Sequence, residues 1–310
     1  MERTIQYMEG EERDGYYVQP MMKRVWAVQL DILKVIDTIC SRHRLKYYAW
    51  YGTLLGAVRH HGFIPWDDDM DLAIVREDYE KFKYYCEKEL PEGWSLLKVG
   101  PTLIRIINTE TIRLDQEFLD RSHGCPFVIG VDIFCLDHIP KDKDEEILWL
   151  NLFWAVANLY VHWNLFQEDA EWQKNRWDQL TEIETLTGYH FDRQSSVSDQ
   201  LYALADKVAA MYWDAKSHEI AVISSLRRNS AYRIPNSYFR RVIRVPFEDT
   251  TIPILKDYDL LCRLSYGKDY MTPRKYSMHS NIQKQMGRLR KYFQDQGKEL
   301  PECFHMTFEE

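Results

Sequence analysis

Apolar positions recur with helical spacing in some parts of the chain and form short continuous runs in others. Between residues 22 and 44 they recur every three or four positions, which predicts an amphipathic helix, and a second helix is expected at 77–90. Residues 1–140 therefore predict an α+β fold, in which a mixed sheet carries flanking helices. Short apolar runs predict the strands of this sheet at 46–51, 72–75, 94–99, 103–108 and 127–135.

The pattern changes after these strands. Residues 141–238 have helical periodicity, many aromatic side chains and few glycines, and predict a helical insertion or subdomain. Its densest apolar stretch, 147–166, is interrupted by asparagine and histidine. We therefore expect a buried, aromatic-rich helix there and no membrane span, which needs about 20 apolar residues. Residues 239–310 predict helices at 254–266 and 281–292, and we expect this segment to complete the site.

The composition narrows the class of protein. With 310 residues, 45% of them hydrophobic and 28% charged, the chain is expected to be soluble and globular. A net charge of −8 argues against nucleic acid as a partner. Six cysteines without a CxxC pair fit reduced thiols. The polar, acidic N-terminus is unlike a targeting peptide, so we expect a cytoplasmic protein without a transmembrane segment, free to make peripheral contact with the inner face of the membrane.

Residues 48–75, YAWYGTLLGAVRHHGFIPWDDDMDLAIV, carry the strongest chemical signal. Side chains alternate along a strand, so Asp69 and Asp71 would share one face, about 7 Å apart. Two such carboxylates repel each other unless a cation lies between them, and Mg²⁺ prefers carboxylate oxygens together with substrate phosphates. Acidic runs are also common in solvated turns, so the cluster alone leaves both interpretations open.

Two neighbouring features favour the metal site. Gly52 and Thr53 are expected to form a strand-to-helix corner, where backbone N–H groups approach a phosphate and a helix N-terminus attracts an anion. Asp132 interrupts a strong strand signal, where an unpaired buried charge would be costly. Asp132 would be explained if it completed a three-carboxylate site with Asp69 and Asp71.

Alternatives to this three-acid site stay open. Asp132 could instead form a structural ion pair with Arg105 or Arg113. Asp137, which follows the same predicted strand, also fits an ordinary turn residue.

The segment GTLLGAVRHHGFIPWDDDMDLAI resembles the signature of the LicD family, which includes bacterial LicD phosphotransferases and, more distantly, fukutin-related proteins. This family belongs to the nucleotidyltransferase-fold superfamily, whose pattern is a Gly-Ser/Thr turn, an Asp-x-Asp pair and a third acid on a later strand. Three further segments, LIRIIN, GVDIFCLDHIP and IRVPFEDTTIPILKDYDLLCRLSYGKDYMTP, are similar to other parts of the family pattern. The matching positions in this chain would be Gly52, Thr53, Asp69, Asp71 and Asp132.

The resemblance implies a nucleotidyltransferase-like catalytic core in residues 1–140. It also implies transfer of a phosphoryl-linked group, typically phosphocholine, from CDP-choline or a similar CDP-activated donor. The acceptor would be a sugar hydroxyl of a glycan or lipid-linked oligosaccharide, such as a teichoic acid, lipopolysaccharide or capsule precursor. The implied cofactor is Mg²⁺ or Mn²⁺, with one ion held by Asp69 and Asp71 and a second shared with Asp132, all three being catalytic.

Substrate contacts are expected around these acids. Arg59 and Arg105, with Gly52 and Thr53, are candidates for the donor phosphates, because a guanidinium group grips phosphate oxygens in a bidentate way. A plain surface arginine is the alternative for each. Aromatic faces attract a quaternary ammonium group, and the candidates for choline or acceptor contacts are Tyr51, Trp66, Tyr266 and Tyr270.

Other functions remain open at this stage. Transfer of the nucleotide itself, or use of CDP-ribitol or CDP-glycerol, would need the same metal site. A non-enzymatic alternative is an interaction protein whose acidic cluster binds Ca²⁺ or is purely structural.

Overall fold

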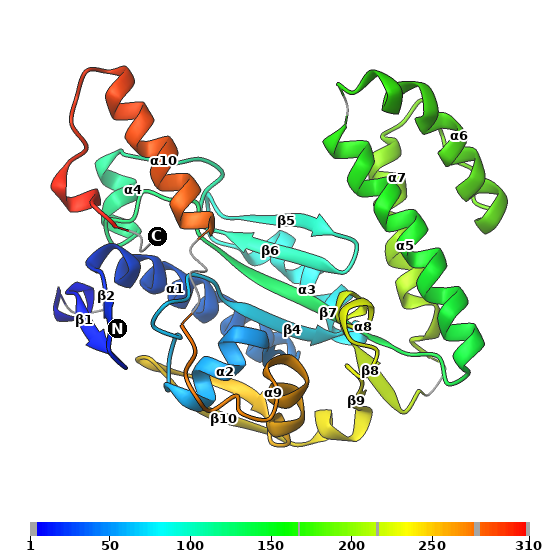
Figure 1. The fold of residues 1–310 in the computed structure, drawn as a ribbon, viewed down its shortest axis with the longest axis horizontal. Helices are drawn as coiled ribbons and strands as arrows, with labels where there is room; N and C mark the ends of the chain where they lie inside the picture. Colours follow the sequence, from blue (N-terminus) through cyan, green and yellow to red (C-terminus); the bar gives the residue numbers. More distant parts are fainter. Residues whose placement is uncertain (1–4, 167, 215–216, 276–279, 308–310) are drawn as a thin grey trace.

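The computed structural model describes residues 5–166, 168–214, 217–275 and 280–307. It has a mixed α+β fold, which confirms the predicted fold class. A central sheet crosses the molecule, three helices extend from one end of it, and a single helix, α10 (Ser280–Asp295), stands over the other end (Figure 1). Every helix in the described ranges is too short or too polar to cross a bilayer.

The central sheet has seven strands, five of which lie in the order β3-β4-β7-β6-β5. β4 and β7 run parallel, and the other neighbouring pairs are antiparallel. At the C-terminal end of β7 the sheet continues through β8 and β9. The strands are β3 (Tyr48–Ala49), β4 (Asp71–Val75), β5 (Ser95–Gly100), β6 (Leu103–Ile107), β7 (Gly130–His138), β8 (Glu219–Ala221) and β9 (Ile234–Pro235).

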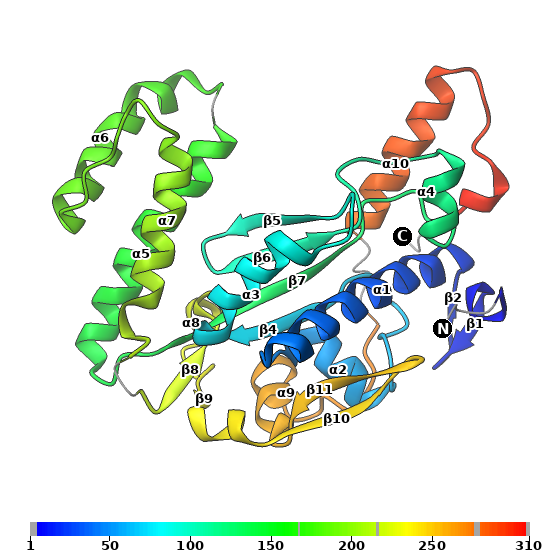
Figure 2. The ribbon, with the colours of Figure 1, turned by 180° about the vertical axis from the view of Figure 1, so that it is seen from behind.

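Two helices of the first region follow the sequence prediction closely. α1 (Pro20–His43) begins with a proline, whose fixed φ suits a first helical turn, and its C-cap is Arg44 in the left-handed conformation at φ 56°. α3 (Arg76–Glu89) buries Tyr79 and Phe82 against the sheet. Both helices lie across the same side of the sheet (Figure 2).

The two faces of the sheet have different surroundings because side chains alternate along each strand. On the face that α1 and α3 cover, Leu72, Ile104 and Ile133 are fully buried. On the opposite face the neighbouring positions Asp71 and Asp132 are only partly buried. We call this second side the open face, and the site lies on it.

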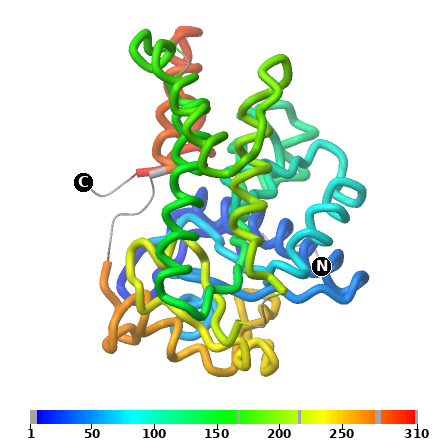
Figure 3. Tube along the Cα trace, turned by 90° about the vertical axis from the view of Figure 1, so that its right-hand side faces the viewer, coloured from blue at the N-terminus to red at the C-terminus, as the bar shows by residue number. Residues whose placement is uncertain are grey.

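Three helices form an arm with a hydrophobic core of its own. α5 (Lys143–Leu165) and α7 (Val197–Ala209) pack along each other, and α6 (Ala170–Thr187) returns beside them (Figure 3). The hydroxyl of Ser196 accepts from the Asp199 N–H at 3.2 Å and so caps the N-terminus of α7. The arm's hydrophobic core is distinct from that of the sheet.

The prediction that residues 147–166 form a buried helix was wrong in part. α5 is amphipathic: Trp149 and Phe153 are 3% and 2% exposed, but Leu148 and Leu165 are about 70% exposed. The helix lies at the outer side of a small arm, so it has neighbours on only one side.

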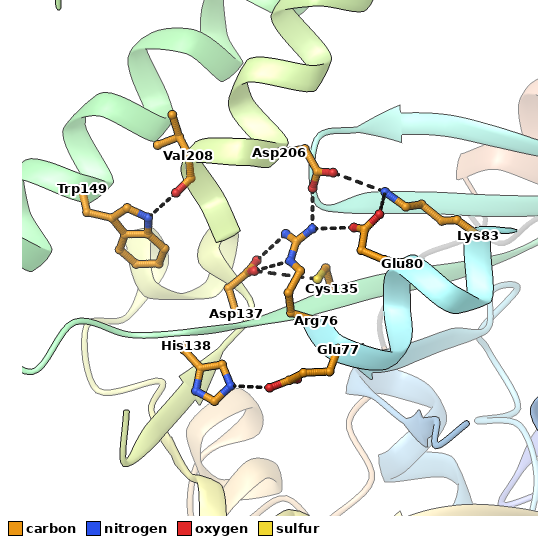
Figure 4. A network of polar contacts seen from close by, with 10 residues as sticks. All are labelled: Arg76, Glu77, Glu80, Lys83, Cys135, Asp137, His138, Trp149, Asp206 and Val208. Carbon is orange, nitrogen blue, oxygen red and sulfur yellow. Dashed lines mark hydrogen bonds and ion pairs between the residues drawn. The ribbon is translucent and has the colours of Figure 1, made fainter. Parts of the chain in front are cut away.

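A buried ion-pair cluster joins the arm to the sheet (Figure 4). The Arg76 guanidinium donates to both carboxylate oxygens of Asp137, at 2.6 and 3.1 Å, and to Asp206 of α7 at 2.5 Å. Lys83 and Glu80 complete the cluster. The interpretation of Asp137 as a turn residue was therefore wrong, because its side chain, 1% exposed, lies within β7 and is neutralised by Arg76.

The C-terminal region begins with a hairpin that the sequence pattern did not reveal. β10 (Val242–Phe247) pairs with β11 (Thr250–Leu255), and α9 (Tyr258–Tyr266) follows. The helix predicted at 254–266 was wrong at its start, because Ile252 and Ile254 are buried as part of a strand. In the described part of the chain the other elements are η1 (Ile5–Met8), β1 (Glu11–Arg13), β2 (Tyr16–Val18), α2 (Tyr51–Arg59), α4 (Gln116–Arg121), η2 (Ala210–Tyr212), α8 (Ile223–Arg228), η3 (Asn236–Arg240) and η4 (Glu302–Phe304).

Candidate active site

Three charged side chains from neighbouring strands form a row across the open face of the sheet. Asp71, the first residue of β4, is the register partner of Asp132 in β7. On the other side of Asp132, the register partner is Arg105 in β6. Neighbouring strands lie about 5 Å apart, so the parallel pairing of β4 and β7 places the carboxylates of Asp71 and Asp132 within reach of one ion.

Asp69 lies just before this row and points out of the sheet. The Met70 side chain that follows is fully buried, whereas Asp69 is exposed. One carboxylate oxygen from each of Asp67, Asp68 and Asp69 lies within 4.8 Å of the other two. Among the described residues no other three acidic, histidine or cysteine side chains are as close, so Asp69, Asp71 and Asp132 do not meet at this distance.

Two helix N-termini point at the first two acids. At the start of α2, a Cβ atom on Gly52 would lie 2.8 Å from Oδ2 of Asp67, so glycine is what lets this carboxylate approach. At the start of α10, the Ile282 N–H donates to Oδ2 of Asp68 at 3.4 Å. Helix N-termini stabilise negative charge, so both helices help to hold the acidic cluster together.

The ionisation of the cluster reflects the repulsion among its members. Burial, and then the charges of Asp69 and Asp132, hold the pKa of Asp71 well above its usual range. Loss of hydration, and then the charge of Asp132, raise the pKa of Asp69. Burial and the charge of Asp69 raise the pKa of Asp68 to about 7. A divalent cation would relieve this repulsion, so this set of oxygen ligands fits Mg²⁺ or Mn²⁺.

Arg105 neutralises one member of the row. Its Nε and Nη2 atoms donate to the two carboxylate oxygens of Asp132 at 2.5 and 2.7 Å. Gly130 makes room for this contact, since a Cβ atom there would lie 2.6 Å from Cδ of Arg105. This pair of Arg105 with Asp132 is one of the two alternatives that the sequence left open. Arg113, the other possible partner, pairs with Asp115 instead.

Thr53 holds the start of β4. The predicted corner at Gly52 and Thr53 is the first turn of α2, whose N-cap is Trp50. Oγ1 of Thr53 accepts the Asp71 N–H at 2.8 Å, and the Trp50 N–H donates to the Asp71 carbonyl at 2.9 Å. The helix and the first carboxylate of the row are thus joined directly, while a contact from Thr53 to phosphate stays a prediction.

A cleft of about 640 Å³ opens beside the row, a size that suits a small-molecule ligand. Asp69, Arg105 and Asp132 line its sheet side, and α10 lines the opposite side. The sequence predicted α10 as a basic helix but did not assign its residues to the site, because no local motif marks them. The residues that α10 contributes are Asn281, Ile282, Gln285 and Arg288.

Two of the four predicted aromatic residues feel the charges of the acids. Loss of hydration at the hydroxyl, and then the charges of Asp67 and Asp71, raise the pKa of Tyr266, whose side chain is partly exposed. The Tyr51 hydroxyl bonds to that of Ser225, and its ring packs edge-on against Phe134. The Tyr51 backbone is in the left-handed region at φ 39°, which costs a non-glycine residue about 1 kcal/mol or more.

The other two aromatic candidates are placed elsewhere. Trp66 is 4% exposed and packs edge-on against Tyr16. Tyr270 is 8% exposed and donates to Asp259 at 2.9 Å. The sequence did not point to Tyr232, because this residue lies outside every recognised motif. Burial raises its pKa most, followed by Tyr51, and the charge of Asp71 also contributes.

The structure does not bring Arg59 to the row. Arg59 is the last residue of α2, and a nine-residue helix is about 13 Å long. Its Nη1 atom donates to the Tyr270 carbonyl and its Nε atom to His60, both at 2.8 Å. Arg59 therefore supports the segment around Tyr270, and its predicted contact to phosphate is not supported by its position.

Comparison with known proteins adds to this geometry. Residues 44–128 match the family described as LicD/FKTN/FKRP, nucleotidyltransferase domain. A lipopolysaccharide cholinephosphotransferase, LicD, of Haemophilus influenzae is 31% identical over 116 residues, which are 37% of this chain and 44% of that protein. Uncharacterised proteins of Rickettsia typhi and Rickettsia prowazekii are 44% and 47% identical over 52 and 47 residues, 17% and 15% of this chain and 17% and 18% of theirs. The chain thus matches less than half the length of each of these relatives.

Proposed function

We propose that the protein is a metal-dependent phosphotransferase, because residues 44–128 match the nucleotidyltransferase domain of the LicD family. It would move phosphocholine, or a similar phosphate-linked head group, from a CDP-activated donor to a hydroxyl of a cell-surface glycan precursor. The observation that carries the proposal is the strand register that sets Asp71 beside Asp132, whose side chain lines the cleft. The Haemophilus relative, named as a lipopolysaccharide cholinephosphotransferase, supports the choice of head group and acceptor.

The acids of the row would hold the metal. Asp69, Asp71 and Asp132 are the proposed ligands of Mg²⁺ or Mn²⁺, because their carboxylates already repel one another. When bound, the ion would neutralise the donor diphosphate and make the acceptor hydroxyl more acidic. The remaining requirement is positioning, since phosphoryl transfer depends mainly on alignment and charge neutralisation.

Arg105 and Asp132 are proposed to change partners during the reaction. In this structure they neutralise each other. Once Asp132 takes part in metal binding, the Arg105 guanidinium becomes available for a phosphate oxygen of the donor in the same cleft. Asp132 is also the acid best placed to accept the proton of the acceptor hydroxyl.

The family description also favours a second candidate, transfer of the nucleotide itself. The two reactions attack different phosphorus atoms of the same donor and share one metal site. Their products differ: phosphocholine transfer releases CMP, whereas nucleotidyl transfer leaves cytidylate on the acceptor.

The test is incubation of the purified chain with Mg²⁺, CDP-choline carrying label in choline or in cytidine, and a glycan precursor. We expect free CMP and choline label on the glycan. Cytidine label on the glycan would favour the second candidate. If neither label moves with CDP-choline, CDP-ribitol or CDP-glycerol, and none of these gives a Mg²⁺-dependent thermal shift, the proposed function is wrong.

A further inference from the structure

α10 carries a stripe of positive charge that leads out of the cleft. Lys284, Arg288 and Lys291 are spaced four and three residues apart, so they lie on one side of the helix. All three are exposed, and no ion pair with an acid is found for them within the described ranges. We call these three residues the α10 stripe.

The stripe is held in a fixed position against the cleft. The Gln285 side chain accepts the Val128 N–H at 2.8 Å and donates to the Val128 carbonyl at 2.9 Å. The apolar residues Ile282, Met286 and Leu289 of the same helix are at most 1% exposed, so the helix is packed firmly in place. Arg288 follows Gln285 by one turn and lines the same cleft, so the anchored helix presents it at the rim.

The charge balance of the cleft explains what this arginine could bind. The lining contains four carboxylates and two guanidinium groups, and one of these, Arg105, is already paired with Asp132. A phosphate-bearing molecule would meet repulsion along the sheet side of the cleft. On the α10 side it would meet Arg288, with Lys284 one turn before it and Lys291 one turn after it on the same side of the helix.

We propose that the α10 stripe binds the phosphate groups of the substrate that occupies this cleft. The inference rests on the proposed function in taking the cleft as the substrate site. Arg288 grips phosphate oxygens with its planar group of donors, and the two lysines add positive charge on either side of it along the helix. The phosphate belongs either to the nucleoside diphosphate donor or to a phosphate-bearing acceptor, and the two sources can be separated by experiment.

The experiment is calorimetric binding of CDP and cytidine, in the presence of Mg²⁺, to the full chain and to the triple variant Lys284→Gln, Arg288→Gln, Lys291→Gln. The same proteins are titrated with a phosphate-bearing glycan and with that glycan after phosphatase treatment. Lys174→Gln, an exposed change on α6, is the matched control. Thermal unfolding checks that all variants stay folded.

We expect the triple variant to lose about tenfold or more in affinity for one phosphate-bearing ligand, with no change for its phosphate-free counterpart. Loss for CDP assigns the stripe to the donor, and loss for the phosphorylated glycan assigns it to the acceptor. Unchanged affinity for both, or an equal loss for cytidine, overturns the inference. Stripe-dependent binding of CDP by a chain that transfers nothing would instead overturn the proposed function alone.

Discussion

Strand β7 carries two aspartates, five residues apart, that each pair with an arginine but differ in exposure. Asp137 pairs with Arg76, and these side chains are 1% and 3% exposed. Asp132 pairs with Arg105, and these are 16% and 36% exposed. Both pairs are bidentate, so the geometry of the pair does not separate them.

What separates the two pairs is their surroundings. Around Asp137 every charge has a partner, because Asp206, Glu80 and Lys83 close the cluster (Figure 4). Next to Asp132 in the row, the carboxylate of Asp71 is repelled by the neighbouring acids, and among the described residues no ion pair is found for it. A cluster in which each charge is paired maintains architecture, whereas a row of carboxylates that repel one another is arranged for a cationic ligand. Four changes test this distinction.

The largest effect is expected from Asp71→Asn. Removing one proposed metal ligand should cost several kcal/mol of transition-state stabilisation, which is on the order of 10³-fold in kcat/KM. The fold should be unaffected or slightly more stable, because the substitution removes a carboxylate that its neighbours repel. Transfer assays and thermal unfolding measure the two effects. Full activity in Asp71→Asn would remove Asp71 from the catalytic site.

Arg76→Met is expected to reduce stability, in contrast to Asp71→Asn, which is expected to reduce activity. Breaking a buried ion pair on one side should lower the free energy of unfolding by about 3–5 kcal/mol, since Asp137 is left buried without a counter-charge. Urea denaturation measures this loss. The double variant Arg76→Met with Asp137→Leu should recover part of it. An unchanged midpoint in Arg76→Met would show that the cluster does not hold the arm to the sheet.

A smaller effect should appear in the pH dependence of stability without metal. The folded-state pKa of Asp68, about 7, lies above its ordinary value of 3.8, so the folded chain keeps a proton that the unfolded chain releases. In EDTA, stability should therefore fall by up to a few kcal/mol between pH 4 and pH 7, the interval between the two pKa values. Asp68→Asn should flatten this slope and exposed Asp178→Asn should not. Equal slopes in both variants would contradict the assignment.

The smallest effect is expected from Gly130→Ala. The added Cβ atom would displace Arg105, 2.6 Å away, and separate it from Asp132. A half-exposed ion pair contributes about 0.2–1 kcal/mol, so Mg²⁺ should bind up to about fivefold more tightly once Asp132 is released. Gly100→Ala is the control, since nothing lies within 4 Å of its added Cβ atom. Calorimetric Mg²⁺ titrations that coincide for the two variants would show that Arg105 does not compete with the ion.

Local patterns predicted the features that depend on neighbours in the sequence. The acid inside a strand signal marked Asp132 as a residue that needs a partner, but left open whether that partner is an ion shared with the other acids or Arg105; in the sheet Asp132 lies between Asp71 and Arg105. Local patterns could not show that Asp137 is buried, because its partners Arg76 and Asp206 come from distant helices. The cleft wall supplied by α10 was missed for the same reason: Arg288 reaches the site only through tertiary packing.

The hydrogen bond from the Asp71 N–H to Thr53 has a mechanical consequence. It couples the first turn of α2 to the first residue of β4, and the Trp50 N–H, which donates to the carbonyl of Asp71, adds a second link to the same residue. Any anion that pulls on this helix end therefore shifts the carboxylate of Asp71 as well. Docking of a charged ligand and adjustment of the coordinating oxygens become one motion rather than two successive ones.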